Sequence, residues 1–225
     1  GELSGTQYTP EKGWDENKLD MFRRHIIQLG NSGVYVIYDE LEGKEAVTWS
    51  YLLHTVELPM EMKELPNEVQ VTGKNKAGGV SVAHLFSSAK TEQAIADTFF
   101  CAPTNWKNVT NAQGKALKYP NHWHFSSTTV PCKVARFLTV MDTHGNNRPD
   151  MKVVRNGNTV QVGDWIINCN LTEKGKAAIT VTNKSEKVSL NYDAGKKEGA
   201  TILTDQVKGK QISKVLTDYL PDFEI

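Results

Sequence analysis

Val34-Tyr-Val-Ile-Tyr38 is rich in β-branched and aromatic residues and is bounded by turn residues, a combination that is typical of a β-strand. Two further segments have the same character, namely Ala46-Val-Thr-Trp-Ser-Tyr-Leu-Leu53 and Val80-Ser-Val-Ala-His-Leu-Phe86. The dominant period in these segments is two and not the three to four residues of a helix. The segments therefore predict strands.

The same pattern recurs along the rest of the chain, between turns rich in Gly, Asn, Asp and Pro. It predicts strands at residues 123–127, 132–142, 159–162, 165–168, 177–182 and 188–190, with a hairpin turn at Asn156-Gly157. Helix signals are few. Residues 91–97 are compatible with one or two helical turns, and residues 211–219 with a short helix or a last strand. We expect an all-β protein, an antiparallel β-sandwich of layered sheets with few short helices.

A change in strand character near Arg148-Pro149-Asp150 divides the chain. The predicted strands before this point are long and aromatic, whereas those after it are shorter and carry many Lys, Thr and Asn residues. We expect residues 1–148 to form a β-sandwich core and residues 149–225 to form a smaller sheet or subdomain packed on it. At 225 residues, the chain is long enough to bury a sizeable core.

Charge and hydropathy bear on the partners of the chain. The 26 Lys and Arg residues equal the 26 Asp and Glu residues in number, whereas nucleic-acid-binding proteins usually carry a basic surplus. No apolar run approaches the roughly 18 residues that suggest a membrane-spanning helix. We therefore expect neither nucleic acid nor membrane as a partner. Because the chain opens with Gly1 instead of Met, we expect it to come from a longer protein, with any secretion signal upstream.

Motifs for cofactors and nucleophilic catalysis are not found in the sequence. It has no glycine-rich phosphate loop, no nucleophile elbow and no HExxH motif. Cys101, Cys132 and Cys169 are widely spaced and match no metal-binding pattern, so we interpret them as buried free thiols, with one disulfide left open. No cofactor is expected.

His122 and His124 form a His-x-His motif in Asn121-His-Trp-His-Phe125. On a strand, such residues share one face at a separation of about 6.5–7 Å, which suits zinc or copper if a third ligand converges. No Asp, Glu or Cys lies nearby in the sequence, so no metal is predicted, and the alternative is a half-exposed face with Trp123 and Phe125 in the core. We keep both histidines as candidates for contact with a saccharide.

The remaining histidines and a group of acidic residues have simpler interpretations. Structural roles are predicted for His25, His54 and His84, and a solvent-facing position for His144 in its turn. Asp39, Glu40 and Glu42 are interpreted as an acidic turn after a strand. Asp39 and Glu40 do not suit the paired carboxylates of glycoside hydrolysis, because adjacent strand residues point to opposite faces.

Tryptophan side chains offer flat apolar surfaces on which sugar rings pack. Trp106 lies in the polar, loop-like segment Pro103-Thr-Asn-Trp-Lys-Asn108 and is either an exposed sugar contact or a loop anchor. Trp49 and Trp165 lie within predicted strands and are assigned to the core.

Three consecutive segments in the first half of the chain form a recognisable series: Phe22-Arg-Arg-His-Ile-Ile-Gln-Leu-Gly30, Val34-Tyr-Val-Ile-Tyr-Asp-Glu-Leu41 and Val47-Thr-Trp-Ser-Tyr-Leu-Leu-His54. This series resembles the sheet region of the heparinase II/III-like polysaccharide lyases. Residues 80–86 and 133–140 are also similar to the sheet region of that family, so the resemblance covers roughly residues 19–140.

The resemblance implies a fold and a function. Members of the family carry an α/α toroid followed by layered antiparallel sheets, and they cleave uronic-acid polysaccharides, including glycosaminoglycans, by β-elimination. Their base and zinc ligands lie upstream of the matching segments, so no catalytic residue is carried over. The resemblance implies the C-terminal β region of a periplasmic or extracellular lyase, inactive alone, with the polysaccharide and the helical toroid of the same chain as partners.

Two other functions stay open. One is a free-standing carbohydrate-binding β-sandwich module, and the other is a small metalloenzyme built on His122 and His124. If the chain supports a toroid, we expect a contiguous apolar patch where that domain docks. A uniformly polar surface would favour the autonomous module.

Overall fold

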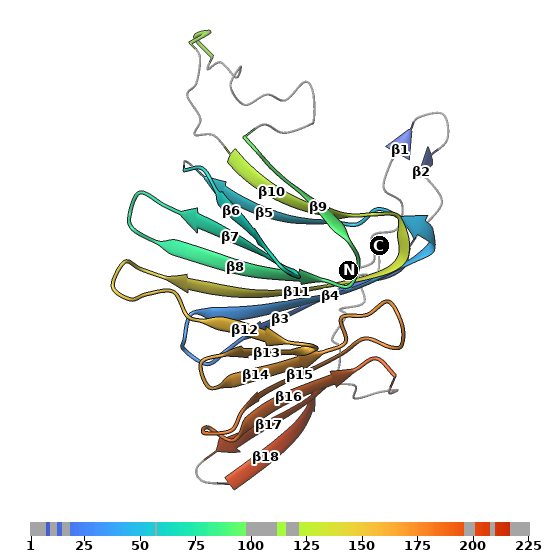
Figure 1. Cartoon of the computed structure of the whole chain (residues 1–225), viewed down its shortest axis with the longest axis vertical. Helices are drawn as coiled ribbons and strands as arrows, with labels where there is room; N and C mark the ends of the chain where they lie inside the picture. The colour runs from blue at the N-terminus through green and yellow to red at the C-terminus, as the bar shows by residue number, and fades with distance from the viewer. Residues whose placement is uncertain are drawn as a thin grey trace.

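The computed structural model describes residues 19–56, 58–97, 112–115 and 122–195, together with the backbone of four strands at 8–9, 13–14, 201–207 and 210–216. The side chains of Val56 and His122 lie outside this description. Every regular element in the described residues is a strand (Figure 1). The prediction of an all-β antiparallel fold is confirmed.

The strands form three large antiparallel sheets and one short pair, β1 (Tyr8–Thr9) with β2 (Gly13–Trp14). The six-stranded middle sheet has the order β3 (Leu19–Gln28), β4 (Val34–Val47), β11 (Cys132–His144), β8 (Val80–Ser87), β7 (Glu68–Lys74), β6 (Glu61–Leu65). The three-stranded cap sheet has the order β5 (Ser50–Val56), β10 (His122–Thr129), β9 (Thr91–Ala96). The seven-stranded C-terminal sheet runs in chain order through β12 (Val153–Asn156), β13 (Thr159–Val162), β14 (Trp165–Cys169), β15 (Ala178–Asn183), β16 (Val188–Asp193), β17 (Thr201–Val207) and β18 (Lys210–Leu216).

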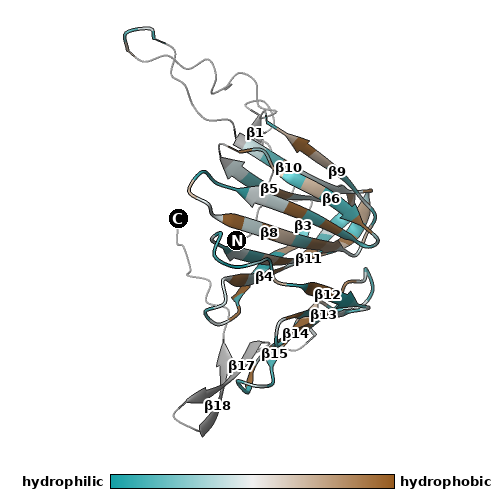
Figure 2. Cartoon of the chain, turned by 60° about the vertical axis from the view of Figure 1, so that its left-hand side comes forward, coloured by the Kyte–Doolittle hydropathy of each residue, from teal (hydrophilic) through white to brown (hydrophobic). Residues whose placement is uncertain are grey.

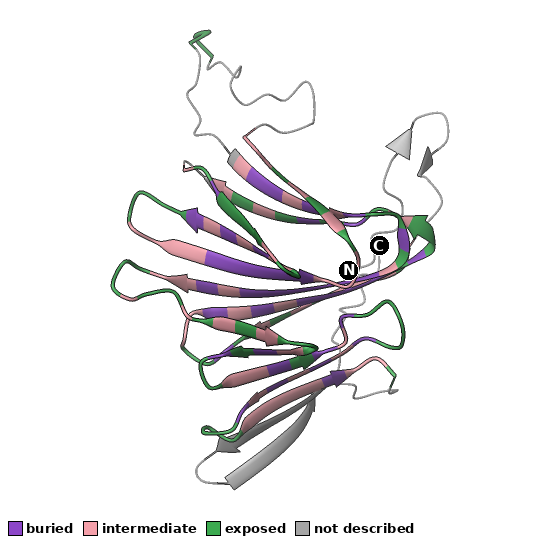
Figure 3. Cartoon of the chain, viewed as in Figure 1, coloured by how far each residue is buried: buried purple, intermediate pink, exposed green. Residues whose placement is uncertain are grey.

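The middle sheet lies between the other two and is covered on both faces (Figure 1). Along β11, Leu138 and Val140 belong to the core shared with the C-terminal sheet, whereas Ala135 and Phe137 belong to the core shared with the cap sheet. Residues 135–140 are consecutively buried as a result (Figure 3). Strands buried on both faces carry near-continuous apolar runs, and Figure 2 shows hydrophobic residues on β8 and β11 and hydrophilic residues at the turns.

The C-terminal sheet begins at Val153, close to the division expected at residues 148 and 149. Its first hairpin turns one residue later than predicted, because Asn156 still pairs with Thr159 and the two turn residues are Gly157 and Asn158; Gly157 has a φ of 60°, a conformation that favours glycine. The sheet shares its apolar core with the middle sheet, through side chains such as Ile167 and Ile179.

Two sequence-based interpretations are corrected, and one that was left open is decided. Residues 91–97, expected as helical turns, form the edge strand β9, in which Ile95 packs on the core while Ala94 is exposed. The sequence of β9 suits both structures, and pairing with β10 decides between them. The open segment at residues 211–219 continues β18 as a strand as far as Leu216. Asp39 and Glu40 lie inside the long strand β4 and not in a turn.

Two of the three cysteines lie within the described residues. Cys132 and Cys169 are buried free thiols, and burial raises the pKa of Cys169 to about 12, which makes its thiol unreactive. Cys101 lies outside the described residues.

In the part of the chain that the structure describes, no helix has the length and apolar character needed to cross a membrane.

Leu138→Ala tests the role of the core between the middle and C-terminal sheets. Leu138 is fully buried, so we expect the free energy of unfolding to fall by about 2–5 kcal/mol through lost burial and a residual cavity. Leu52→Ala is the matched control, because Leu52 is 48% exposed, and we expect a change within about 0.5 kcal/mol. Urea unfolding followed by tryptophan fluorescence measures both, and equal losses would contradict the assignment.

Candidate functional site

Of the residues proposed from the sequence as saccharide contacts, His124 is the one whose side chain lies within the described residues. Trp106 and the side chain of His122 lie outside the described residues. His124 is only 6% exposed and pairs across the cap sheet with His54, their ring centroids 6.0 Å apart. The half-exposed face expected around His124 is therefore wrong for this residue, although its neighbour Phe125 lies in the core as expected. Sugar contact by these residues stays a prediction.

A metal site at the histidines would require a third ligand to converge on them. Within the described residues, no three His, Cys, Asp or Glu side chains are grouped so that they could hold a metal ion. His84 is buried and its Nδ1 lies 2.6 Å from Glu68 Oε1, and His25 packs against Tyr192 with ring centroids 4.1 Å apart. The structural roles predicted for these two histidines are confirmed.

Asp39 and Glu40 are buried on opposite faces of β4, and each is paired with an arginine of the neighbouring strand β3. On the cap-sheet side, Arg24 donates from Nε and Nη2 to the two carboxylate oxygens of Asp39, both at 2.7 Å. The Arg24 guanidinium also lies over the Tyr51 ring, 5.2 Å from its centroid. This bidentate pair neutralises a charge that would otherwise be costly to bury.

Glu40 links the middle sheet to the C-terminal sheet. Its Oε1 accepts a hydrogen bond of 2.5 Å from the hydroxyl of Tyr192 on β16 and one of 2.9 Å from Arg23 Nη1. Arg23 Nη1 also lies 2.5 Å from the Tyr192 oxygen. One carboxylate therefore holds β3, β4 and β16 together.

The protonation states of this group follow from its surroundings. Burial, then the neighbouring Glu40, raises the pKa of Tyr192, so its phenol stays protonated. Burial alone would raise the pKa of Glu40, but the nearby His25 ring, with Nε2 at 3.6 Å from Oε1, the hydrogen bond from Tyr192 and the charge of Arg23 outweigh it and hold the pKa below its usual value. Tyr192 is 1% exposed, so this phenol does not reach a substrate in the way that a catalytic base must.

Tyr192→Phe removes the hydroxyl while keeping the ring in the core. We expect the free energy of unfolding to fall by about 1–3 kcal/mol, because Glu40 loses one of its donors in a buried site. Tyr35→Phe on β4, which removes the same hydroxyl from a half-buried ring, is the control and should change little. Denaturant unfolding measures both, and an unchanged stability of the Tyr192 variant would show that the hydroxyl does not hold the sheets.

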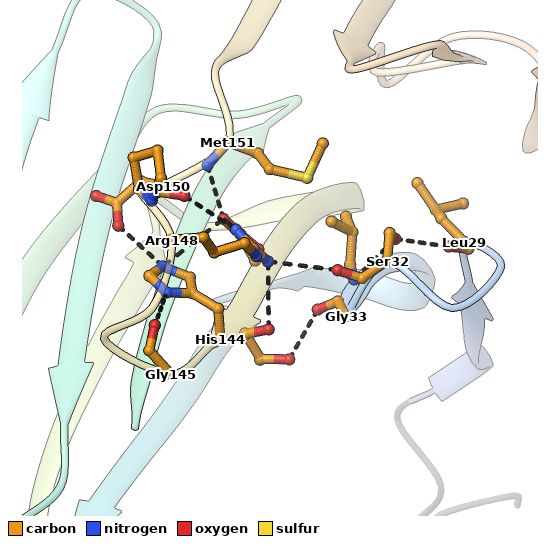
Figure 4. Close-up of polar contacts among 12 residues, drawn as sticks. Leu29, Ser32, Gly33, His144, Gly145, Arg148, Asp150 and Met151 are labelled. Atoms are coloured by element: carbon orange, nitrogen blue, oxygen red, sulfur yellow. Dashed lines mark hydrogen bonds and ion pairs between the residues drawn. The ribbon is translucent and has the colours of Figure 1, made fainter. Parts of the chain in front are cut away.

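A second polar cluster fixes the connection from β11 to the C-terminal sheet (Figure 4). Asp142 is fully buried and binds Arg148 through both carboxylate oxygens, and its Oδ2 also accepts a hydrogen bond of 2.7 Å from the backbone N–H of Met151. His144 Nε2 lies 3.0 Å from Asp150 Oδ1. The His144 side chain is only 5% exposed, so its predicted solvent-facing position is wrong.

The β3–β4 turn closes the same cluster. Thr143 donates to the Gly33 carbonyl from its backbone N–H at 2.9 Å and from its hydroxyl at 2.7 Å. Gly33 has a φ of 77°, and a Cβ built there would overlap the carbonyl oxygen of Thr143. Only glycine combines this conformation with so close an approach.

Asp142→Asn tests the electrostatic part of this connection. Burial alone would raise the pKa of Asp142, but Arg148 and the Met151 N–H hold it below its usual value. A lowered folded-state pKa contributes stability above the unfolded pKa, about 3.9, and this contribution is lost as pH falls through the folded value. We therefore expect the stability difference between wild type and variant to be largest near neutral pH and to shrink in acid. Urea unfolding at several pH values measures it, with the exposed Asp164→Asn as control.

A polar pocket of about 570 Å³ opens where the three large sheets meet, and we call it the junction pocket. Its described lining residues come from or next to strands of all three sheets: Glu64, Leu65, Asn67, Glu68, Val69, Leu85, Ser87, Ser88, Ala89, Lys90, Thr91, Gln93, Ser127, Arg155 and Leu171. The lining combines hydroxyl, amide and charged groups, which suits a hydroxylated ligand. No signal in the sequence predicts this site, because Lys90 and Arg155 share no local motif and line one pocket only through sheet packing.

The sequence was also compared with known proteins. It matches no protein-family model and no curated protein.

Proposed function

We propose that the chain is the C-terminal β region of a heparinase II/III-like polysaccharide lyase, which supports β-elimination of uronic-acid polysaccharides without supplying the catalytic base. The architecture supports this proposal. The segments that carry the resemblance build β3, β4, β5, β8 and β11, most of them in the doubly covered middle sheet. A layered antiparallel arrangement of this kind is what the resemblance implies.

We assign the chain a supporting role because its buried carboxylates and phenols are engaged within the sheets. Burial raises the pKa of Tyr38 and Tyr51 as well as that of Tyr192, so these phenols resist deprotonation. The carboxylates of Asp39 and Glu40 are bound to arginines. These groups stabilise the sheets, so we place the proton-abstracting group on the helical toroid that the proposal puts upstream in the same chain.

A free-standing carbohydrate-binding module is the second candidate, and the junction pocket favours it. The described lining of the pocket consists largely of hydrogen-bonding groups. A module of this type would bind saccharide fully without a toroid. In either case the polysaccharide implies a periplasmic or extracellular location, which remains part of the proposal.

Affinity electrophoresis and an elimination assay test the proposal together. We expect gels that contain uronic-acid polysaccharides to retard the chain, while the isolated chain produces no unsaturated uronate detectable by ultraviolet absorbance. The same chain joined to its toroid should produce it. Elimination by the isolated chain would contradict the supporting role, and migration unaffected by every uronic-acid polysaccharide would contradict the polysaccharide function.

A further inference from the structure

We infer that the junction pocket is a binding site for a short saccharide that carries a carboxylate. This inference rests on the proposed function for the class of ligand, and it adds the site and the size of the ligand. The volume of about 570 Å³ falls within the roughly 300–1,000 Å³ of small-molecule sites. A pocket at the meeting point of three sheets, as opposed to a continuous groove, suits one or a few sugar units.

Arg155 provides a fixed cation in the pocket. Its guanidinium lies over the Phe86 ring, 5.1 Å from the centroid, and donates from Nε to the Gly157 carbonyl at 2.8 Å and from Nη1 to the Asn67 carbonyl at 3.1 Å. Within the described residues, Nη2 has no hydrogen-bond partner. These contacts orient the guanidinium before a ligand arrives, which reduces the entropy cost of binding an anion.

Lys90 is the second cation. It is exposed in the turn between β8 and β9 and lines the same pocket. A carboxylate between a fixed guanidinium and a flexible ammonium would form charge-assisted hydrogen bonds with both, and such bonds are stronger than those of neutral groups.

The lining also carries two acidic residues, Glu64 and Glu68. Glu68 is engaged by His84, with 2.6 Å between Oε1 and Nδ1, and its side chain is 15% exposed. Glu64 is exposed on the edge strand β6, where water and salt screen its charge. The positive charge that a ligand would meet is therefore local, at Arg155 and Lys90, and is not an excess over the whole lining, which has two acidic and two basic residues.

Hydroxyl and amide groups on the cap-sheet side complete the site. Gln93 donates from Nε2 to Thr91 Oγ1 at 2.7 Å and to Ser127 Oγ at 3.5 Å, and all three residues line the pocket. The described lining has no aromatic side chain. Recognition would therefore depend on hydrogen bonds and charge instead of stacking on an aromatic ring, in contrast to the role expected of Trp106.

Isothermal titration calorimetry of the intact chain with matched sugars tests the inference. The acidic probes are digalacturonate and dimannuronate, and their neutral counterparts are galactobiose and mannobiose. We expect at least one acidic disaccharide to bind more tightly than its neutral counterpart, and Lys90→Gln to weaken that binding about tenfold, as expected for the loss of one charged hydrogen bond. Lys44→Gln, an exposed change on β4 outside the lining, should leave it unchanged.

The outcomes separate this inference from the proposed function. Retardation by polysaccharides in the electrophoresis experiment, without any preference for acidic disaccharides, overturns the inference and leaves the proposed function standing. Binding of an acidic disaccharide that is unaffected by both Lys90→Gln and Arg155→Lys overturns the site while keeping the ligand class. If neither polysaccharide nor disaccharide binds, both fail.

Discussion

The middle sheet is covered on both faces, and this imposes a requirement on the centre of β4, because Asp39 and Glu40 are buried there on opposite faces with little water to solvate them. An unpaired buried charge costs several kcal/mol, so each carboxylate needs a partner of opposite charge. The register of β3 against β4 supplies both, since Arg24 is paired with Asp39 and Arg23 with Glu40. Slipping β3 by one residue would place each arginine on the wrong face. Charge pairing therefore helps to specify the register of this strand pair.

Polar contacts as well as apolar burial join the C-terminal sheet to the middle sheet. Besides Tyr192, the Tyr38 hydroxyl donates to the Asn170 carbonyl at 2.8 Å, and buried Arg136 donates to the carbonyls of Thr172 and Gly175. These donors come from β4 and β11 and reach the segment that connects β14 to β15. Directional bonds of this kind select one docking geometry from the many that an apolar face alone would allow.

The strands that were predictable from the sequence are those in which burial produces a clear pattern. Residues 34–38 are apolar on both faces, residues 135–140 are buried throughout although they include Arg136 and Thr139, and the strand at 159–162 and the hairpin turn at Gly157 follow ordinary hairpin chemistry. Sequence periodicity did not predict a strand that forms only through pairing with another strand. The edge strand β9 has a sequence that also suits a helix.

Functional positions were harder to predict for the same reason. The acidic turn assigned to Asp39 and Glu40 was wrong because the arginines that make their burial possible lie on a different strand. The junction pocket combines Lys90 and Arg155, which are close only once three sheets have packed. No local pattern in the chain contains that information.

The chain order of the strands also bears on how the molecule folds. The C-terminal sheet pairs each strand with its neighbour in sequence, so it can grow by successive hairpins with little loop-closure entropy. The centre of the middle sheet pairs β4 with β11, and the adjoining Gly33 and Thr143 are 110 residues apart. Contacts of such high sequence separation form slowly. We therefore expect the C-terminal hairpins to form first, with their apolar face exposed until β4 and β11 meet, so that aggregation competes with folding during this interval.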